Sequence, residues 1–129
     1  MKLPPEQVEV VIAEAHLYLD RPYDENFGCV DFVRRVYQVV GVEIPRLMKY
    51  VPPPHWINID PKEIDNPPPG HLMFLRRKLT KTTRPWTHVV LILPDQKCIH
   101  CSRHFGEKVC ISSLEDIFVL YDFAPSRQA

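Results

Sequence analysis

Three residues of this chain could together perform nucleophilic chemistry: Cys29, His88 and His100. Cys29 follows a glycine and opens a stretch with helical periodicity, whereas the two histidines stand in apolar, strand-like segments. The first turn of a helix favours a thiolate, because its free N–H groups carry partial positive charge. One histidine could then take the thiol proton while the other orients it. This is the chemistry of a cysteine hydrolase with a Cys-His-His triad.

The hydrophobic pattern predicts the elements that must position these residues. Apolar side chains at helical spacing predict one helix over 5–19 and another over 29–40, with Gly41 as its stop. After Gly70 the pattern becomes that of short strands joined by turns. The expected strands cover 71–75, 87–93, 97–102, 108–111 and 118–123. Helices followed by an antiparallel meander predict an α+β fold with the helices on one side of the sheet.

The turn between the second and third strands decides where the histidines lie. A hairpin centred near Asp95 brings His88 close to His100, because neighbouring strands lie about 5 Å apart. Farther along, Ser112 and Glu115 form a capping-box pattern, which predicts a short helix over 113–117.

Length and composition favour a single domain over 1–129. Sixteen basic and sixteen acidic side chains cancel, so no global field draws the chain to nucleic acid. No apolar run reaches the roughly 20 residues that span a bilayer, and charges interrupt the N-terminus where a secretory signal would be apolar. Four cysteines in such a chain are expected to be reduced thiols. We therefore expect cytoplasmic synthesis, with export by another route left open.

A proline-rich segment at 45–69 interrupts the pattern and contains eight of the fourteen prolines. Proline lacks a backbone N–H and has a fixed φ, which excludes long helices and central strands. We expect an ordered surface excursion that Trp56 and Ile57 attach to the body of the domain.

Several segments resemble the NlpC/P60 peptidases in their family order. The similarity extends over roughly residues 20 to 115. The family's nucleophile helix and its flanks are matched by RPY at 21–23, GCVDFVRRVY at 28–37 and GVEIPR at 41–46. The family's "PGDLVFF" strand is matched by PGHLMF at 69–74. Its "HVGIYLG" strand is matched by HVVLIL at 88–93, and its "IHAS" strand by IHCS at 99–102.

The resemblance implies a compact papain-like fold, a triad of Cys29, His88 and His100, and no cofactor. The implied partner is a peptide or amide substrate, with cleavage of amide bonds in cell-wall stem peptides as the family activity. Tyr23 matches a tyrosine that lines the family's site, and we take Asp31 and Trp86 as further candidate substrate-binding residues.

This chain departs from the family pattern beside the nucleophile. Gly28 stands where the family usually has Asp, and Val30 and Asp31 stand where it usually has Ser-Gly. In the family the Asp and Ser side chains help to hold the free amine of a stem peptide, so the substrate is left open. Asp31, in the first helical turn, is also expected to disfavour a nearby thiolate electrostatically.

Three other functions remain alternatives. An inactive family member could serve as a binding or phage-tail assembly module, and an intracellular amidase or acyltransferase would use the same thiol. A small zinc domain would use the C-x2-C-x2-H-x5-C pattern. Its ligands would be Cys98, Cys101, His104 and Cys110. Strand alternation argues against zinc, because it places Cys98 and Cys101 on opposite faces of one strand.

Two further features have a structural and a functional interpretation. Basic residues before His88 form either a solvated hairpin tip, which we favour, or a site for a substrate carboxylate or phosphate. These are Arg76, Arg77, Lys78, Lys81 and Arg84. His71 replaces the family's usual Asp, and we expect it to be structural.

Overall fold

A computed structural model describes residues 2–45, 56–79, 81 and 84–124. Its first half contains two helices and a short 3-10 turn, and its second half contains the sheet. The elements are α1 (Pro5–His16), α2 (Cys29–Gln38), η1 (Pro61–Glu63), β1 (Leu72–Arg77), β2 (His88–Leu93), β3 (Lys97–Ser102), β4 (Lys108–Ser113), α3 (Leu114–Leu120) and β5 (Tyr121–Phe123). No helix in the described part of the chain is both long and apolar enough to cross a membrane.

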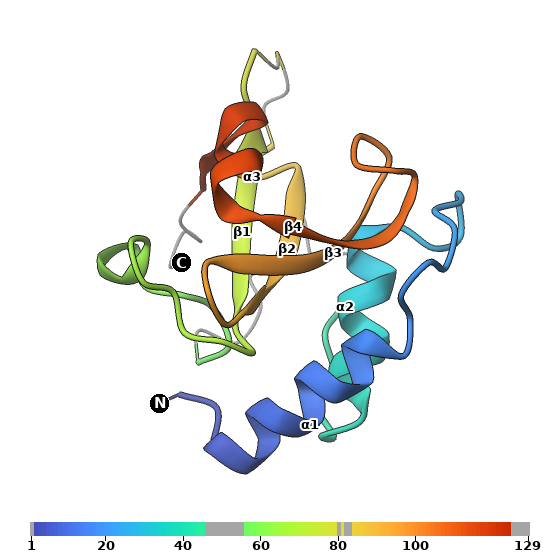
Figure 1. The fold of residues 1–129 in the computed structure, drawn as a ribbon, viewed down its shortest axis with the longest axis vertical. Helices are drawn as coiled ribbons and strands as arrows, with labels where there is room; N and C mark the ends of the chain where they lie inside the picture. Colours follow the sequence, from blue (N-terminus) through green and yellow to red (C-terminus); the bar gives the residue numbers. More distant parts are fainter. Residues whose placement is uncertain (1, 46–55, 80, 82–83, 125–129) are drawn as a thin grey trace.

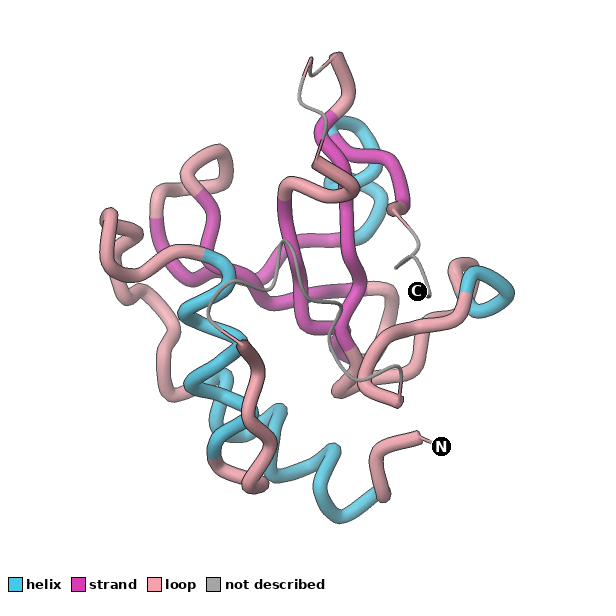
Figure 2. Tube along the Cα trace, turned by 180° about the vertical axis from the view of Figure 1, so that it is seen from behind, coloured by secondary structure: helices cyan, strands magenta, loops and turns pink. Residues whose placement is uncertain are grey.

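The five strands form one antiparallel sheet in the order β4-β3-β2-β1-β5. The sheet is strongly twisted, so that the β3–β4 hairpin runs across the direction of β1 and β2 (Figure 1). Helices α1 and α2 lie together on one side of the sheet, which the view from behind also shows (Figure 2). The expected α+β class, with N-terminal helices packed on an antiparallel sheet, is confirmed.

Alternation along the strands divides the interior into two cores. Odd-numbered residues of β2, such as Val89 and Leu91, pack against α1 and α2. Even-numbered residues, such as Val90 and Ile92, pack with Leu114 and Ile117 around α3 on the opposite face. The short C-terminal helix therefore covers the side of the sheet that the N-terminal helices leave open, whereas the sequence pattern predicted all helices on one side.

The helix ends differ from the expected ones by a few residues. Helix α2 ends at Gln38, and Gly41 adopts a φ of 74°, which suits a glycine after a helix C-terminus. The predicted cap at Ser112 is wrong by one position. Ser113 caps α3 by accepting the Asp116 N–H at 3.1 Å, because Ser112 is still paired within β4. Helix α3 then extends to Leu120 and shortens the last strand to 121–123.

The proline-rich excursion is described from residue 56, so residues 46–55 of the predicted segment lie outside the described part. Ile57 is fully buried and Trp56 packs against the same core, as predicted. The Leu72 N–H donates to the Ile57 carbonyl at 2.7 Å, and the Ile59 N–H donates to the Leu72 carbonyl at 3.0 Å. These contacts attach the excursion to the start of β1.

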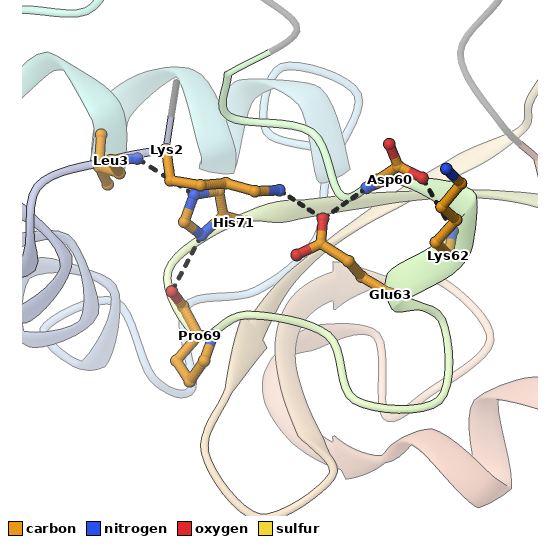
Figure 3. A network of polar contacts seen from close by, with 7 residues as sticks. All are labelled: Lys2, Leu3, Asp60, Lys62, Glu63, Pro69 and His71. Carbon is orange, nitrogen blue, oxygen red and sulfur yellow. Dashed lines mark hydrogen bonds and ion pairs between the residues drawn. The ribbon is translucent and has the colours of Figure 1, made fainter.

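His71 connects the N-terminus to this excursion (Figure 3). Its Nε2 accepts the Leu3 N–H at 3.2 Å, so its Nδ1 carries the proton and donates to the Pro69 carbonyl at 3.1 Å. The neighbouring Lys2 forms an ion pair with Glu63. Burial lowers the pKa of His71 and keeps the ring neutral. This tethering agrees with the structural role expected for His71.

Candidate active site

A cavity of about 720 Å³ opens where the start of α2, the start of β2 and the end of β3 meet. Both a cysteine and a histidine from the predicted triad lie on its wall. The lining residues are Tyr23, Asp24, Glu25, Gly28, Cys29, Val30, Asp31, Arg77, Arg84, Trp86, Thr87, His88, Cys101, Ser102, Arg103, His104 and Tyr121.

Cys29 is the first residue of α2, so its thiol lies at the positive end of the helix. Gly28 precedes it as the N-cap in extended conformation, and its N–H donates to Oδ2 of Asp31 at 3.0 Å. Asp31 thereby replaces the side-chain cap that a glycine cannot provide. The thiol is half-buried and borders the cavity, and its place at the start of the helix is the one expected from the sequence.

Burial dominates the electrostatics of Cys29 and raises the pKa of its thiol to about 11. The backbone N–H groups of Val89 and Val30 act in the opposite direction and lower this pKa. The Asp31 carboxylate raises it further, which confirms the predicted direction of its effect. The resting thiol is therefore protonated at neutral pH, and a base must remove its proton.

His88 and His100 are hydrogen-bonded through Nε2 of His88 and Nδ1 of His100, which lie 2.8 Å apart. Both rings are almost completely buried. His88 also stacks on Tyr121, with the ring centroids 5.2 Å apart and 26° between the planes. The predicted proximity of the two histidines is confirmed.

A third contact continues this chain of hydrogen bonds. Nε2 of His100 lies 2.9 Å from Oγ of Ser112 on the next strand. If His100 donates to Ser112, its Nδ1 is a free acceptor and His88 must donate to it from Nε2. That tautomer leaves Nδ1 of His88 unprotonated. Nδ1 is the atom that could accept a proton from a thiol.

Burial also sets the charge of both histidines. It lowers the pKa of His88 well below 6.5, and the neighbouring His100 lowers it further. Burial lowers the pKa of His100 to about 4. Both imidazoles are therefore neutral at pH 7. A neutral thiol and a neutral base agree with proton transfer during the reaction, in place of a preformed ion pair.

The three candidate substrate-binding residues all border the cavity. Tyr23 lies beside Gly28: a Cβ at residue 28 would be 3.4 Å from the tyrosine ring. Trp86 is largely buried and packs edge-on against Phe74, with centroids 4.9 Å apart. Asp31 is engaged by the Gly28 N–H. The substrate-binding role of each of these residues stays a prediction.

Sequence reasoning missed two residues of the site. Tyr121 stacks on His88 although it lies 33 residues farther along the chain, and Ser112 contacts His100 although it was interpreted as a helix cap. Tyr121 carries no local signal, because only the pairing of β5 with β1 brings it to the cavity. Ser112 could have been found from the strand register, which places it on the same strand face as the cross-strand partner of His100, Cys110.

The zinc alternative does not fit the fold. Cys98 is buried in the core around α3, whereas Cys101 is buried in the core against α1 and α2. Two ligands on opposite faces of one strand cannot share a tetrahedral ion. Within the described residues, no group of three or more Cys, His, Asp or Glu side chains could hold a metal.

Comparison with known proteins agrees with this geometry. The NlpC/P60 family model matches residues 19–124. The chain belongs to the NlpC/P60 family. A comparison with curated proteins found no significant match.

Several solved structures share the fold. The NlpC/P60 domain of the peptidoglycan hydrolase SagA is 26% identical with a TM-score of 0.65, and the match covers 93% of this chain and 98% of that domain. A Bacillus cereus NlpC/P60 protein is 23% identical with a TM-score of 0.70, and the match covers 92% of this chain but 39% of that protein. NlpC1 from Trichomonas vaginalis is 13% identical with a TM-score of 0.74, and the match covers 96% of this chain and 44% of that protein. The chain thus spans about two fifths of the length of the last two relatives.

Proposed function

We propose that this NlpC/P60 domain is a cysteine-dependent amide hydrolase that acts through a triad of Cys29, His88 and His100. The observation that carries the proposal is the hydrogen-bonded series from His88 through His100 to Ser112, beside a cavity that also contains the Cys29 thiol. This series leaves one nitrogen of His88 free to act as a base. A buried His88 with no catalytic role would not need to border an open cavity.

In the proposed reaction, Nδ1 of His88 removes the thiol proton as Sγ of Cys29 attacks the substrate carbonyl carbon. The new C–S bond places negative charge on the carbonyl oxygen, which the N–H groups at the start of α2 can stabilise. The intermediate collapses by breaking the C–N bond, and His88 returns its proton to the leaving amine. Water, deprotonated by His88, then hydrolyses the thioester and restores the thiol.

For the substrate we propose a peptidoglycan stem peptide or a related amide. Family membership and the similarity to the SagA domain support this class. Gly28 and Val30 lack the side chains that would contact a free amine, so we expect the amine of the substrate to be bound differently here.

A digest of defined muropeptides and synthetic γ-D-glutamyl dipeptides tests the proposal. Mass spectrometry should detect new amine ends with the wild-type protein and none with Cys29→Ala. Turnover that persists in Cys29→Ala would refute the mechanism. Turnover of simple amides without turnover of any muropeptide would be consistent with the mechanism but would refute the proposed substrate class.

An inactive binding module is the second candidate, and the raised pKa of Cys29 favours it. Such a module would bind a muropeptide with the same affinity in the wild type and in Cys29→Ala, and neither protein would release an amine. Isothermal calorimetry and the digest, performed on the same samples, distinguish the two candidates.

A further inference from the structure

Three arginines from separate parts of the sequence line the cavity. Arg77 ends β1, Arg84 lies in the segment before β2, and Arg103 follows β3. We call these residues the arginine rim. His104 lies among them, with its Nδ1 3.1 Å from a guanidinium nitrogen of Arg77. The fold, and not a local sequence motif, thus gathers positive charge beside the Cys29 thiol.

Two cations of the rim, Arg77 and Arg103, are close enough to influence the same imidazole. Burial lowers the pKa of His104, and the charges of Arg77 and Arg103 lower it further. A guanidinium can only donate hydrogen bonds, so the contact with Arg77 requires a neutral His104 that accepts. Neutral His104 avoids adding a further positive charge to the rim, but it does not neutralise the arginines.

Acidic side chains of the same cavity are used elsewhere. Asp24 accepts the Asn26 N–H at 2.7 Å, and Asp31 accepts the Gly28 N–H at 3.0 Å. Among the ion pairs of the described residues, none joins Arg77 or Arg103 to a carboxylate. The Arg103 guanidinium lies over the Tyr23 ring instead, 5.3 Å from its centroid. The like charges of Arg77 and Arg103 therefore form a site that an external anion would stabilise.

We propose that the arginine rim binds an oxyanion group of the substrate, a carboxylate or a phosphate, next to the carbonyl that Cys29 attacks. The position of the carbonyl rests on the proposed function, whereas the anion site does not. The planar guanidinium matches an oxyanion with two parallel N–H donors. A cavity of about 720 Å³ accommodates such a group together with the acyl portion of a small peptide. The rim would make an acidic acyl donor a better substrate than its neutral counterpart.

A polyanion such as nucleic acid fits this surface less well. Nucleic acid needs several phosphate contacts along an extended basic surface. Here the sixteen basic residues of the chain are balanced by sixteen acidic ones, and Asp24, Glu25 and Asp31 also line the cavity.

Alkylation of Cys29 by iodoacetate and by iodoacetamide tests the site without any turnover. The two reagents have the same leaving group and differ in a carboxylate against a carboxamide. Peptide mass spectrometry gives the rate of each reaction at Cys29, at pH 8.5 and low ionic strength. We expect the iodoacetate-to-iodoacetamide ratio to fall roughly 2- to 5-fold in Arg77→Gln and in Arg103→Gln, as suits exposed charges.

Matched variants separate the site from general effects. Lys62→Gln removes the same charge on η1, outside the cavity, and should leave the ratio unchanged. Arg77→Lys and Arg103→Lys keep the charge and should restore most of the ratio, which excludes misfolding as the cause. An unchanged ratio in both glutamine variants would overturn the proposal.

Competition identifies the preferred anion. Inorganic phosphate and glutarate, each exchanged for chloride at constant ionic strength, should slow the reaction of iodoacetate with Cys29. If phosphate acts at the lower concentration, the site prefers a phosphate group; if glutarate does, it prefers a carboxylate. Protection by neither would also overturn the site. The two proposals can fail separately. If the iodoacetate-to-iodoacetamide ratio falls in the glutamine variants but the wild-type protein hydrolyses no amide, the anion site is supported and the hydrolase is rejected. If the wild-type protein hydrolyses amides but the ratio is unchanged in the variants, the hydrolase is supported and the anion site is rejected.

Discussion

Nε2 of His88 and Nδ1 of His100 lie 2.8 Å apart, although the two residues are not directly opposite each other in the sheet. The β2–β3 register pairs Leu91 with Ile99 and Leu93 with Lys97, and its continuation places His88 opposite Ser102. The histidines are therefore diagonal neighbours on one face, a separation that long or aromatic side chains can bridge. This diagonal geometry turns Nε2 of His88 toward its partner and keeps Nδ1 out of that contact.

Replacement of Cys29 by alanine should abolish hydrolysis and leave the fold intact. The other thiol on the cavity wall, Cys101, is fully buried in the core against α1 and α2 and cannot replace the nucleophile, so we expect kcat to fall by at least about 10³-fold. Thermal unfolding should change little, because the thiol is half-buried at a helix end. Cys98→Ala is the control: this thiol is buried in the core around α3, so its loss should lower stability and leave kcat per folded molecule unchanged.

Removal of the Ser112 hydroxyl should reduce kcat without changing KM. Ser112→Ala leaves Nε2 of His100 without its acceptor and allows the other tautomer, which would protonate the nitrogen that faces His88. A lost hydrogen bond to a buried imidazole corresponds to a roughly 10-fold decrease in kcat. Ser112→Thr keeps the hydroxyl and should retain most of the rate. Equal rates in the alanine and threonine variants would contradict a role of Ser112 in positioning His100.

Acid should destabilise the protein below pH about 6.5. The pKa of His100 falls from 6.5 to about 4 on folding, so the unfolded chain binds more protons between these two values. The free energy of unfolding therefore decreases as the pH falls through this window, by up to about 3 kcal/mol for His100. Urea titrations from pH 7 to pH 4 measure it.

His100→Gln should reduce this slope, because glutamine does not titrate, and buried His88 accounts for part of the slope that is left. The exposed His16→Gln change serves as the matched control and should keep the wild-type slope. A His100→Gln variant with the full wild-type slope would show that other groups cause the acid sensitivity.

Replacement of Asp31 by asparagine should lower the pKa of the Cys29 thiol. The carboxylate raises this pKa through its charge, whereas asparagine retains an oxygen that can accept the Gly28 N–H. Alkylation of Cys29 by neutral iodoacetamide should therefore become faster at a fixed pH, and its pH profile should shift toward acid. Asp116→Asn on the exposed side of α3 is the control. A profile that does not move would mean that the charge of Asp31 does not contribute to the thiol pKa.

Local sequence signals were sufficient for most elements but not for long-range contacts. The periodicity over 29–40 predicted α2, and the alternation around Asp95 predicted the hairpin that joins the histidines. The positions of Tyr121 and of the arginine rim depend on strand order and on loop paths, which no local pattern encodes. The boundary between β4 and α3 was misplaced because two adjacent serines could both cap a helix, and only the register with His100 distinguishes them.

The basic residues before His88 show the same limitation. Their composition favoured a solvated tip, because the chain has no net charge. The structure divides the group: Arg77 and Arg84 border the cavity, whereas Lys78 contacts the Phe118 carbonyl at 2.8 Å. Sequence position alone cannot make this distinction, because Lys78 and Arg84 lie between β1 and β2, where the path of the chain decides what each side chain contacts.

Gly70 should be the glycine that tolerates substitution least. Its φ of 82° disfavours any side chain, and a Cβ there would lie 2.9 Å from Cγ1 of Val8 on α1. Gly41 has a similar φ of 74°, but a Cβ added there would meet no atom within 4 Å, so it measures the backbone cost alone. We expect Gly41→Ala to cost about 1 kcal/mol of unfolding free energy, and Gly70→Ala to cost about 2–4 kcal/mol because overpacking adds to the same strain.

A double-mutant cycle checks the origin of that difference. Val8→Ala removes Cγ1 and Cγ2, the two atoms that the new Cβ would approach most closely, so the Gly70→Ala change should cost less in the Val8→Ala background than in the wild type. Urea unfolding of the four proteins gives the coupling energy. Additive costs would mean that the strain at residue 70 comes from its backbone conformation and not from contact between α1 and the start of β1.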